Sequence, residues 1–420
     1  MAFITKIDCE EIIDSRGVPT LNTTVFLHDG SKGNASVPSG TSTGSSEAVE
    51  LRDRDPNRYG GMGVLNAVNN VRGIIFQAIK SIDVSDQERV DNTMISLDRT
   101  ANKSTLGANA ILSVSLAVAA ASAASEKIPL YEYIRQKAPF VREIEYQLPT
   151  LMVNIIEGGK HVDKGLDFQE FLAVPTGFRF FGESYANAKK LIGSLRNLIK
   201  QKKLELKLGM EGGFSLNLET NDEAIKLIKE AMEVIELYER GFGISLDIAA
   251  NSLFKDGTYL VKDVNKPLYR EEYIEFLVNF SKKHELFSIE DPLSENDLSG
   301  WATLNSKLAG KTLVIGDDLI TTNQKKLNQA LSYDTVNGVV VKPNQIGTLT
   351  ETLNFIVQAK EAGLKIVISH RSGETLDTFI SDLSVAVNAD FIKIGSPAQK
   401  ERSVKYNRLL EIEKELSEIR

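Results

Sequence analysis

Six short apolar runs in this chain each end in a residue that can bind a cation or move a proton. The terminal residues, at spacings of 43, 27, 25, 28 and 23, are Asp247, Glu290, Asp317, Lys342, His370 and Lys393. Any one of these side chains alone is more often a helix cap or a solvated loop residue. Carboxylates that converge without partners repel one another, so the repeated pattern predicts a divalent cation among them.

The run from Ile366 to Ser369 is followed directly by His370, Arg371 and Ser372. Arginine offers a planar fork for phosphate or carboxylate, histidine a proton or a positive charge, and serine a hydroxyl group. A single run of this kind more often marks an ordinary polar loop after a buried strand. Its repetition along the chain favours an anion-binding site.

The six runs are expected to be strands, with helices such as residues 349–363 between them. Strands and helices that alternate at this period predict parallel βα units, which close into a barrel with the carboxyl ends of the strands at one site. The barrel is expected to open irregularly, because two strands, 150–156 and 168–174, precede the long helix 182–203.

The first 140 residues predict a separate α+β domain. Residues 20–27 alternate as a strand, Asp29-Gly30 is a hairpin turn signal, and residues 63–82 and 106–126 are helical. A chain of 420 residues is too long for one ordinary core. The predicted fold class is therefore α/β, with a smaller α+β N-terminal capping domain (1–140) before an irregular (β/α)8 TIM-type barrel (141–420).

The charge and the residue composition of the chain limit the partners and the cellular location that are expected. The net charge is −8 and no basic block occurs, which disfavours nucleic acid as a primary partner. The single Cys9 allows neither an intrachain disulfide nor a multi-thiolate zinc site, and Met1–Lys6 lacks a signal-peptide core, so a cytoplasmic location is expected. The uncharged stretch 107–125 is mostly Ala and Ser, which predicts a buried helix and no membrane span.

Two loops rich in glycine carry further candidates. Residues 38–47 contain many hydroxyl groups and predict either a plain linker or a lid that supplies a hydroxyl ligand. Gly40 to Gly44 fits the letters of a serine-hydrolase elbow, but no buried strand leads into it. Glu211, in the Gly209–Phe214 loop, is either a solvated turn residue or an acid–base group.

Several blocks of the sequence, in this order, resemble one known family, the enolases, over essentially the full length. The blocks are Asp14–Gly17, Pro38–Gly44, Gly107–Ala110, Gln169–Phe171, Glu211–Gly213, Ser288–Asp291, Gly316–Asp318, Lys342 with Asn344–Gly347, and Ser369–Thr375.

The resemblance implies an enolase reaction, the reversible dehydration of 2-phospho-D-glycerate to phosphoenolpyruvate in glycolysis and gluconeogenesis, with two magnesium ions. It implies Lys342 as the base and Glu211 as the acid, with Glu170 beside it. The implied metal ligands are Asp247, Glu290, Asp317 and, on the mobile loop, Ser42. The implied substrate-binding residues are His161, Glu170, Glu290, Asp317, His370, Arg371, Ser372 and Lys393. A homodimer is also implied.

The chain departs from the family pattern near these residues. Met210 stands where Asp is usual, Glu157 where Asn is usual, and Gln399 where Arg is usual. Other departures are Val18, Ile394 and Leu376, and Asn22 and Glu411 replace an acid and an Arg that pair across the dimer. These departures leave open a divergent paralogue acting weakly or on another phosphorylated or carboxylated acid, or a non-catalytic binding protein.

Overall fold

A computed structural model describes the chain except for residues 1, 42–45, 142–143, 163–164, 237–240 and 420. Its N-terminal part is built on an antiparallel sheet of β1 (Ile4–Ile13), β2 (Pro19–Leu27) and β3 (Lys32–Ser36). The residues of β2 are alternately buried and partly exposed over most of its length. The tight turn at Asp29-Gly30 pairs β2 with β3, as the alternation and the turn signal predict.

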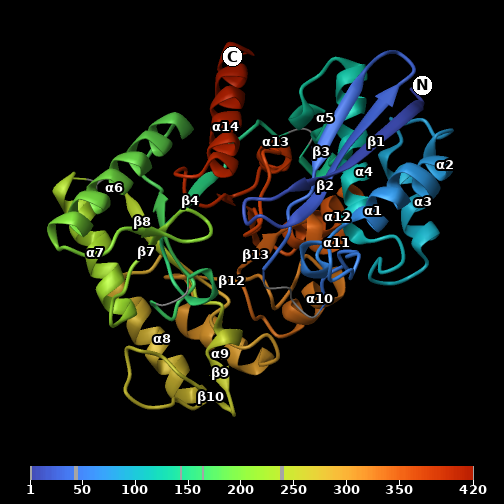
Figure 1. The fold of residues 1–420 in the computed structure, drawn as a ribbon. Helices are drawn as coiled ribbons and strands as arrows, with labels where there is room; N and C mark the ends of the chain where they lie inside the picture. Colours follow the sequence, from blue (N-terminus) through green and yellow to red (C-terminus); the bar gives the residue numbers. More distant parts are fainter. Residues whose placement is uncertain (1, 42–45, 142–143, 163–164, 237–240, 420) are drawn as a thin grey trace.

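Helices cover one face of this sheet (Figure 1). They are η1 (Tyr59–Gly61), α1 (Leu65–Asn70), η2 (Val71–Ile75), α2 (Phe76–Ile79), α3 (Gln87–Asp98), α4 (Ala108–Glu126), α5 (Leu130–Lys137) and η3 (Pro139–Val141). Within the described residues, α4 is the one helix long and apolar enough to cross a membrane, yet 83% of its apolar window is buried inside the protein. Gly33 lets α4 approach the sheet, because a Cβ there would lie 2.0 Å from the backbone nitrogen of Ala121. The predicted buried helix is confirmed.

The rest of the chain forms a closed barrel. Its strands, in spatial order, are β4 (Thr150–Glu157), β5 (Glu170–Pro175), β8 (Phe242–Asp247), β11 (Ser288–Glu290), β12 (Leu313–Gly316), β13 (Gly338–Val341), β14 (Lys365–Ser369) and β15 (Phe391–Lys393), and β15 pairs with β4. The barrel is mixed, because β5 runs antiparallel to both of its neighbours while the other pairings in the ring are parallel.

Helices surround the barrel (Figure 1). They are α6 (Phe181–Gln201), α7 (Asn221–Val234), α8 (Arg270–His284), α9 (Leu298–Leu308), α10 (Gln324–Ser332), α11 (Pro343–Ile346), α12 (Leu349–Glu361), α13 (Phe379–Ala386) and α14 (Lys400–Ile419). Short elements complete the fold: η4 (Gly159–His161), β6 (Lys207–Leu208), β7 (Phe214–Ser215), η6 (Ala250–Ser252), β9 (Phe254–Lys255) and β10 (Thr258–Tyr259).

The barrel interior is filled at one level by its own apolar cluster: Met152, Leu172, Val174, Ile315, Val340, Val367 and Phe391. Above this layer the register places charged residues at one rim. Glu290 pairs with Asp247, and Lys393 pairs with Ser369. The reversed β5 brings its first residue, Glu170, opposite Asp247.

The N-terminal part meets this rim. Ser39, just before the hydroxyl-rich loop, pairs with Gly373 in the loop after β14. Beside the rim, Asp91 of α3 accepts hydrogen bonds from the backbone N–H (3.0 Å) and the hydroxyl (2.6 Å) of Thr350 at the start of α12. The first contact holds Ser39 against the loop after β14, and the second joins α3 to α12.

Candidate active site

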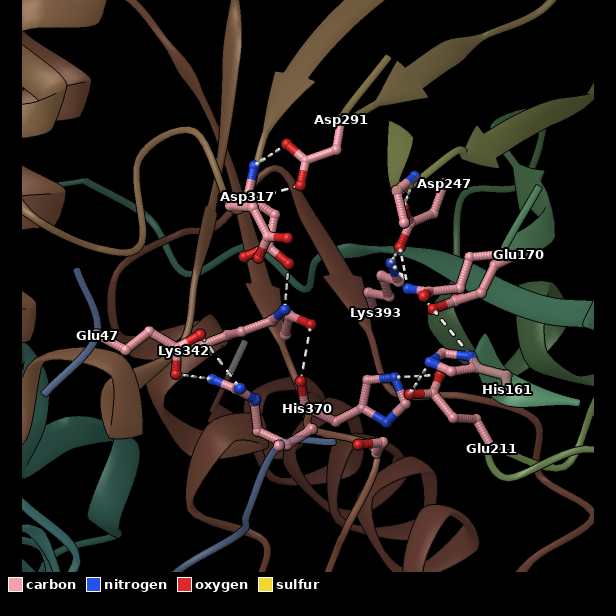
Figure 2. A pocket seen from close by; sticks show the side chains of 17 residues that line it. Glu47, His161, Glu170, Glu211, Asp247, Asp291, Asp317, Lys342, His370 and Lys393 are labelled. Atoms are coloured by element: carbon pink, nitrogen blue, oxygen red, sulfur yellow. Dashed lines mark hydrogen bonds and ion pairs between the residues drawn. The ribbon is translucent and has the colours of Figure 1, made fainter. Parts of the chain in front are cut away.

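Three buried carboxylates stand at the ends of neighbouring strands. Asp247 ends β8, Glu290 ends β11 and Asp317 follows β12, and none is more than 7% exposed. The Lys393 Nζ lies 2.8 Å from Asp247 Oδ2, and the Lys342 ammonium pairs with Asp317 Oδ2 (Figure 2). The Lys393 Nζ also lies 3.0 Å from Glu290 Oε1. The carboxylates and lysines that the sequence predicted to converge therefore share one site.

The charges in this cluster depend on one another. Burial, followed by the charge of Asp247, raises the pKa of Glu290 to about 8. Burial opposes the charge on Lys342, but Asp317 outweighs it and holds the pKa of Lys342 above its usual value. The surrounding acids raise the pKa of Lys393 in the same way. Both lysines are thus cationic while they neutralise the carboxylates.

Asp291 fixes the backbone position of Asp317. Its carboxylate accepts the backbone N–H groups of Asp317 (2.9 Å) and Asp318 (2.8 Å), and burial raises its pKa well above the usual range. On the other side, the Gln345 amide donates to Asp317 Oδ1 at 3.1 Å. Neither Asp291 nor Gln345 was predicted as a site residue, although each lies within three residues of one that was.

The donor set suits magnesium. Oxygen ligands from carboxylates are what this small, hard cation prefers. Ligand atoms of Asp291, Asp317 and Asp318 come within 4.8 Å of one another, whereas Asp247 and Glu290 meet through the Lys393 ammonium. Asp317 is thus the predicted ligand that lies in this group, and the binding of the same cation by Asp247 and Glu290 stays a prediction. Ser42, the fourth predicted ligand, lies outside the described residues.

A second cluster joins the two remaining predicted acids to histidines. Ligand atoms of His161, Glu170 and Glu211 lie within 4.8 Å of one another, and His370 Nε2 lies 3.1 Å from Glu211 Oε2 (Figure 2). Burial, followed by the charge of Glu211, raises the pKa of Glu170 well above its usual value. Burial acts on Glu211 too, but His370 and His161 outweigh it and keep the pKa of Glu211 well below its usual value.

The tautomer of His370 follows from its neighbours. The Arg402 Nη1 donates to His370 Nδ1 at 2.6 Å, and a guanidinium group has only donors. Nδ1 is therefore the acceptor, and Nε2 carries the proton that faces Glu211. Burial lowers the pKa of His370 to about 4, so the ring is neutral near pH 7. Arg402, on α14, had no motif that marked it in the sequence.

Arg371 and Ser372 face the N-terminal part of the chain. The Arg371 Nη1 lies 2.9 Å from Glu47 Oε2 and donates to Asn344 Oδ1 at 3.2 Å. Ser372 Oγ accepts the backbone N–H of Thr41 at 2.9 Å. Gly40 permits the close approach, since a Cβ there would lie 1.8 Å from Arg371 Nη2. Glu47 belongs to the hydroxyl-rich loop but was not predicted to bind Arg371.

Most of these side chains border one hollow, whose space of about 500 Å³ includes its opening to solvent. Of the predicted residues that the structure describes, it borders His161, Glu170, Glu211, Asp247, Asp317, Lys342, His370, Arg371, Ser372 and Lys393, together with Gln169, Asp291 and Asp318. Glu290 lies behind Lys393, to which it is bound. The hollow is small and strongly charged, as a small anion with more than one acidic group requires.

The departures from the family pattern fall in two groups. Glu157, Met210 and Gln399 touch the loop that carries Glu211: the Glu157 carboxylate accepts the Glu211 N–H at 3.1 Å, and the Gln399 amide donates to the Met210 carbonyl at 3.1 Å. Ile394 is buried, while Leu376 is 50% exposed and away from the hollow. Burial and the charge of Glu211 raise the pKa of Glu157 to about 8.

Fold and site together define a barrel protein whose rim gathers lysines, histidines and carboxylates around one hollow. The model of the enolase N-terminal domain matches residues 4–134, and that of the enolase C-terminal TIM barrel domain matches residues 145–420. The chain belongs to the enolase family, and the resemblance inferred from the sequence blocks is confirmed.

Proposed function

We propose that this protein is a magnesium-dependent hydro-lyase that reversibly dehydrates 2-phospho-D-glycerate to phosphoenolpyruvate. The observation that carries the proposal is the pair of Lys342 and Lys393 among Asp247, Glu290 and Asp317, with the Glu170–Glu211 pair across the same hollow. Removal of a carbon-2 proton needs a base, and loss of a carbon-3 hydroxyl needs an acid. The two kinds of group face one hollow, as both steps require.

In this proposal Lys342 takes the carbon-2 proton through Nζ. Asp317 now holds the Lys342 ammonium, and this contact favours the protonated form, which cannot act as a base. One magnesium ion would be held by Asp247, Glu290 and Asp317, and a second by Ser42. The ions would supply positive charge for the substrate carboxylate and weaken the hold of Asp317 on Lys342. Lys393 would place its ammonium against the same carboxylate.

Glu211 would give a proton to the departing carbon-3 hydroxyl, which leaves as water. Glu170, whose pKa burial raises, would carry a proton in the free site and pass it to Glu211 before the hydroxyl departs, while neutral His370 donates its Nε2–H to Glu211. His161 lies 3.8 Å from Glu211 Oε1 and would orient the acid and the substrate. Arg371 and Ser372 would hold the phosphate, so binding exchanges the Arg371–Glu47 contact for one to substrate.

The proposal is tested by absorbance of newly formed enol phosphate from 2-phosphoglycerate at saturating magnesium and after chelation. We expect turnover that disappears on chelation and returns with added magnesium. Absence of turnover at saturating magnesium would refute the proposal, and so would turnover insensitive to a chelator. Conversion of a different phosphorylated or carboxylated acid under the same conditions would favour the divergent paralogue.

A further inference from the structure

The loop that carries Glu211 is short and irregular. It joins β6 (Lys207–Leu208) to β7 (Phe214–Ser215), and its five residues, 209–213, are closed by a hydrogen bond from the Gly209 N–H to the Gly213 carbonyl at 2.8 Å. Such a segment has no regular backbone ladder to fix the direction of a side chain. The position of the Glu211 carboxylate therefore depends on contacts from outside the loop.

Glu157, the last residue of β4, supplies the main contact from the barrel side. Its Oε1 accepts the N–H of Gly213 at 2.6 Å, and both of its oxygens lie 3.1 Å from the N–H of Glu211. The side chain is fully buried. Among the described residues its ion-pair contacts are limited to His161, at 3.9 Å, and burial lowers the pKa of that histidine. Burial and the charge of Glu211 raise the pKa of Glu157 to about 8, and the N–H groups of the loop, with the charge of Arg402, offset part of the cost of burying its carboxylate.

Two glycines of the loop pack closely against the Glu157 carboxylate. A Cβ at Gly209 would lie 2.2 Å from Glu157 Oε2, and one at Gly213 would lie 3.0 Å from Oε1. A larger residue at position 209 would push the carboxylate away from the N–H groups. The loop sequence and the side chain at 157 therefore match each other.

The other side of the loop is also fixed. The Glu211 carbonyl accepts the N–H of Ser396 at 2.9 Å, and the Gln399 amide donates to the carbonyls of Gly209 and Met210. The Glu211 backbone is thus held through both its N–H and its carbonyl group. From this backbone the Glu211 side chain reaches His370 Nε2 at 3.1 Å.

We propose that Glu157 is a positioning residue for Glu211: its carboxylate, by accepting the N–H groups of Glu211 and Gly213, aims the Glu211 side chain at His370 and the hollow. Glu157 itself does not border the hollow and would not touch substrate. The role rests on the proposed function, since Glu211 acts there on the carbon-3 hydroxyl while Lys342 acts on the carbon-2 proton.

The first test is Glu157→Gln, which keeps the length but places an amide donor beside backbone donors. Two rates are measured on 2-phosphoglycerate: exchange of the carbon-2 proton with deuterated solvent by NMR, and net dehydration by absorbance. We expect dehydration to fall about tenfold, within the range for residues that orient a functional group, while exchange falls less than about threefold. A purely structural role would lower both rates together, and an unchanged ratio of the two rates would overturn the proposal.

Asp98→Asn is the matched control. Asp98 is also a buried carboxylate that accepts loop N–H groups, from Leu106 at 2.6 Å and Thr105 at 3.1 Å, but it lies in the N-terminal part at the end of α3. We expect this variant to keep the wild-type ratio of exchange to dehydration. A change of the ratio as large as that of Glu157→Gln would show that the ratio reports stability alone and would overturn the proposal.

A second measurement needs neither a folded variant nor catalysis. In the wild-type protein, hydrogen exchange resolved to single amides should show protection of Glu211 and Gly213, because Glu157 accepts both N–H groups. Amides at these two positions that exchange as fast as those of exposed loops would overturn the contact. Wild-type protein that does not turn over 2-phosphoglycerate would refute the proposed function, whereas the amide measurement would still decide the role of Glu157.

Discussion

Replacing Asp91 by Asn should change how the stability of the protein depends on pH. Asp91 is fully buried on α3, where its Oδ2 accepts the N–H and the hydroxyl of Thr350 and its Oδ1 accepts the Gln87 amide at 3.1 Å. Burial outweighs these hydrogen bonds and raises the pKa of Asp91 from 3.8 to about 6. Because the folded-state pKa is the higher one, the associated stability is present at low pH and is lost as pH rises through about 6.

A shift from 3.8 to about 6 corresponds to about 3 kcal/mol between the two limits, at 1.36 kcal/mol per unit. Asparagine does not titrate, so the free energy of unfolding of Asp91→Asn relative to wild type should rise by up to this amount from pH 4 to pH 7. The other buried acids are common to both proteins and cancel in the difference. The absolute effect at any one pH also contains the cost of placing an amide beside Gln87, whose Oε1 has no hydrogen-bond partner among the described residues.

Urea unfolding of both proteins across this pH range gives the measurement. Thr350→Val is the control, since it removes the hydroxyl donor but leaves the carboxylate in place. The pH-dependent loss of stability should persist in this control and move to higher pH, because the lost hydrogen bond favoured the ionised form. Parallel stability curves for wild type and Asp91→Asn would refute the reasoning.

Three further predictions concern the site and the assembly. Lys342→Ala should abolish exchange of the carbon-2 proton, whereas Glu211→Gln should spare exchange more than dehydration; equal loss of exchange in both would contradict the roles. Met210→Asp places a negative charge next to Glu211 and should raise the pKa of that acid. In a plot of dehydration rate against pH, the fall in rate at high pH should then move to higher pH by about one unit. An unchanged plot would show that a charge at position 210 does not affect Glu211. The resemblance implies a dimer, so light scattering should give about twice the chain mass of 46.3 kDa. Asn22 and Glu411 do not oppose it, because they contact Glu10 (3.1 Å) and Arg408 (3.3 Å) within the subunit. A mass of one chain would contradict the dimer.

The strand ends were predictable because their signal is local. An apolar run followed by a charged residue marks both the strand and its rim, and the six runs became β8, β11, β12, β13, β14 and β15. The direction of β5 was not predictable, since an apolar pattern such as residues 168–174 reads the same either way. That reversal places Glu170 at the rim from the beginning of its strand.

The partners of the site residues were harder to predict. Arg402 binds His370 from 32 residues away, and Glu47 binds Arg371 from 324 residues away. Contacts of this kind depend on how α14 and the N-terminal part pack on the rim, and no local pattern records that packing. Asp291 is an intermediate case. Its position directly after Glu290 at a strand end indicated a site residue, but the sequence did not show that it accepts the backbone N–H groups of Asp317 and Asp318.

The departures from the family pattern at positions 157, 210 and 399 are best understood as one set. Gln399 donates to the Met210 carbonyl, Met210 precedes Glu211, and Glu157 accepts the Glu211 N–H. Residues that share a contact network do not contribute additively to stability or rate. A residue typical of the family at one of these positions would therefore meet neighbours that do not match it: an aspartate introduced at position 210 would meet Gln399 in place of an arginine. In this chain the acid that contacts the Glu211 backbone is Glu157, at the end of β4, where it accepts the N–H groups of Glu211 and Gly213.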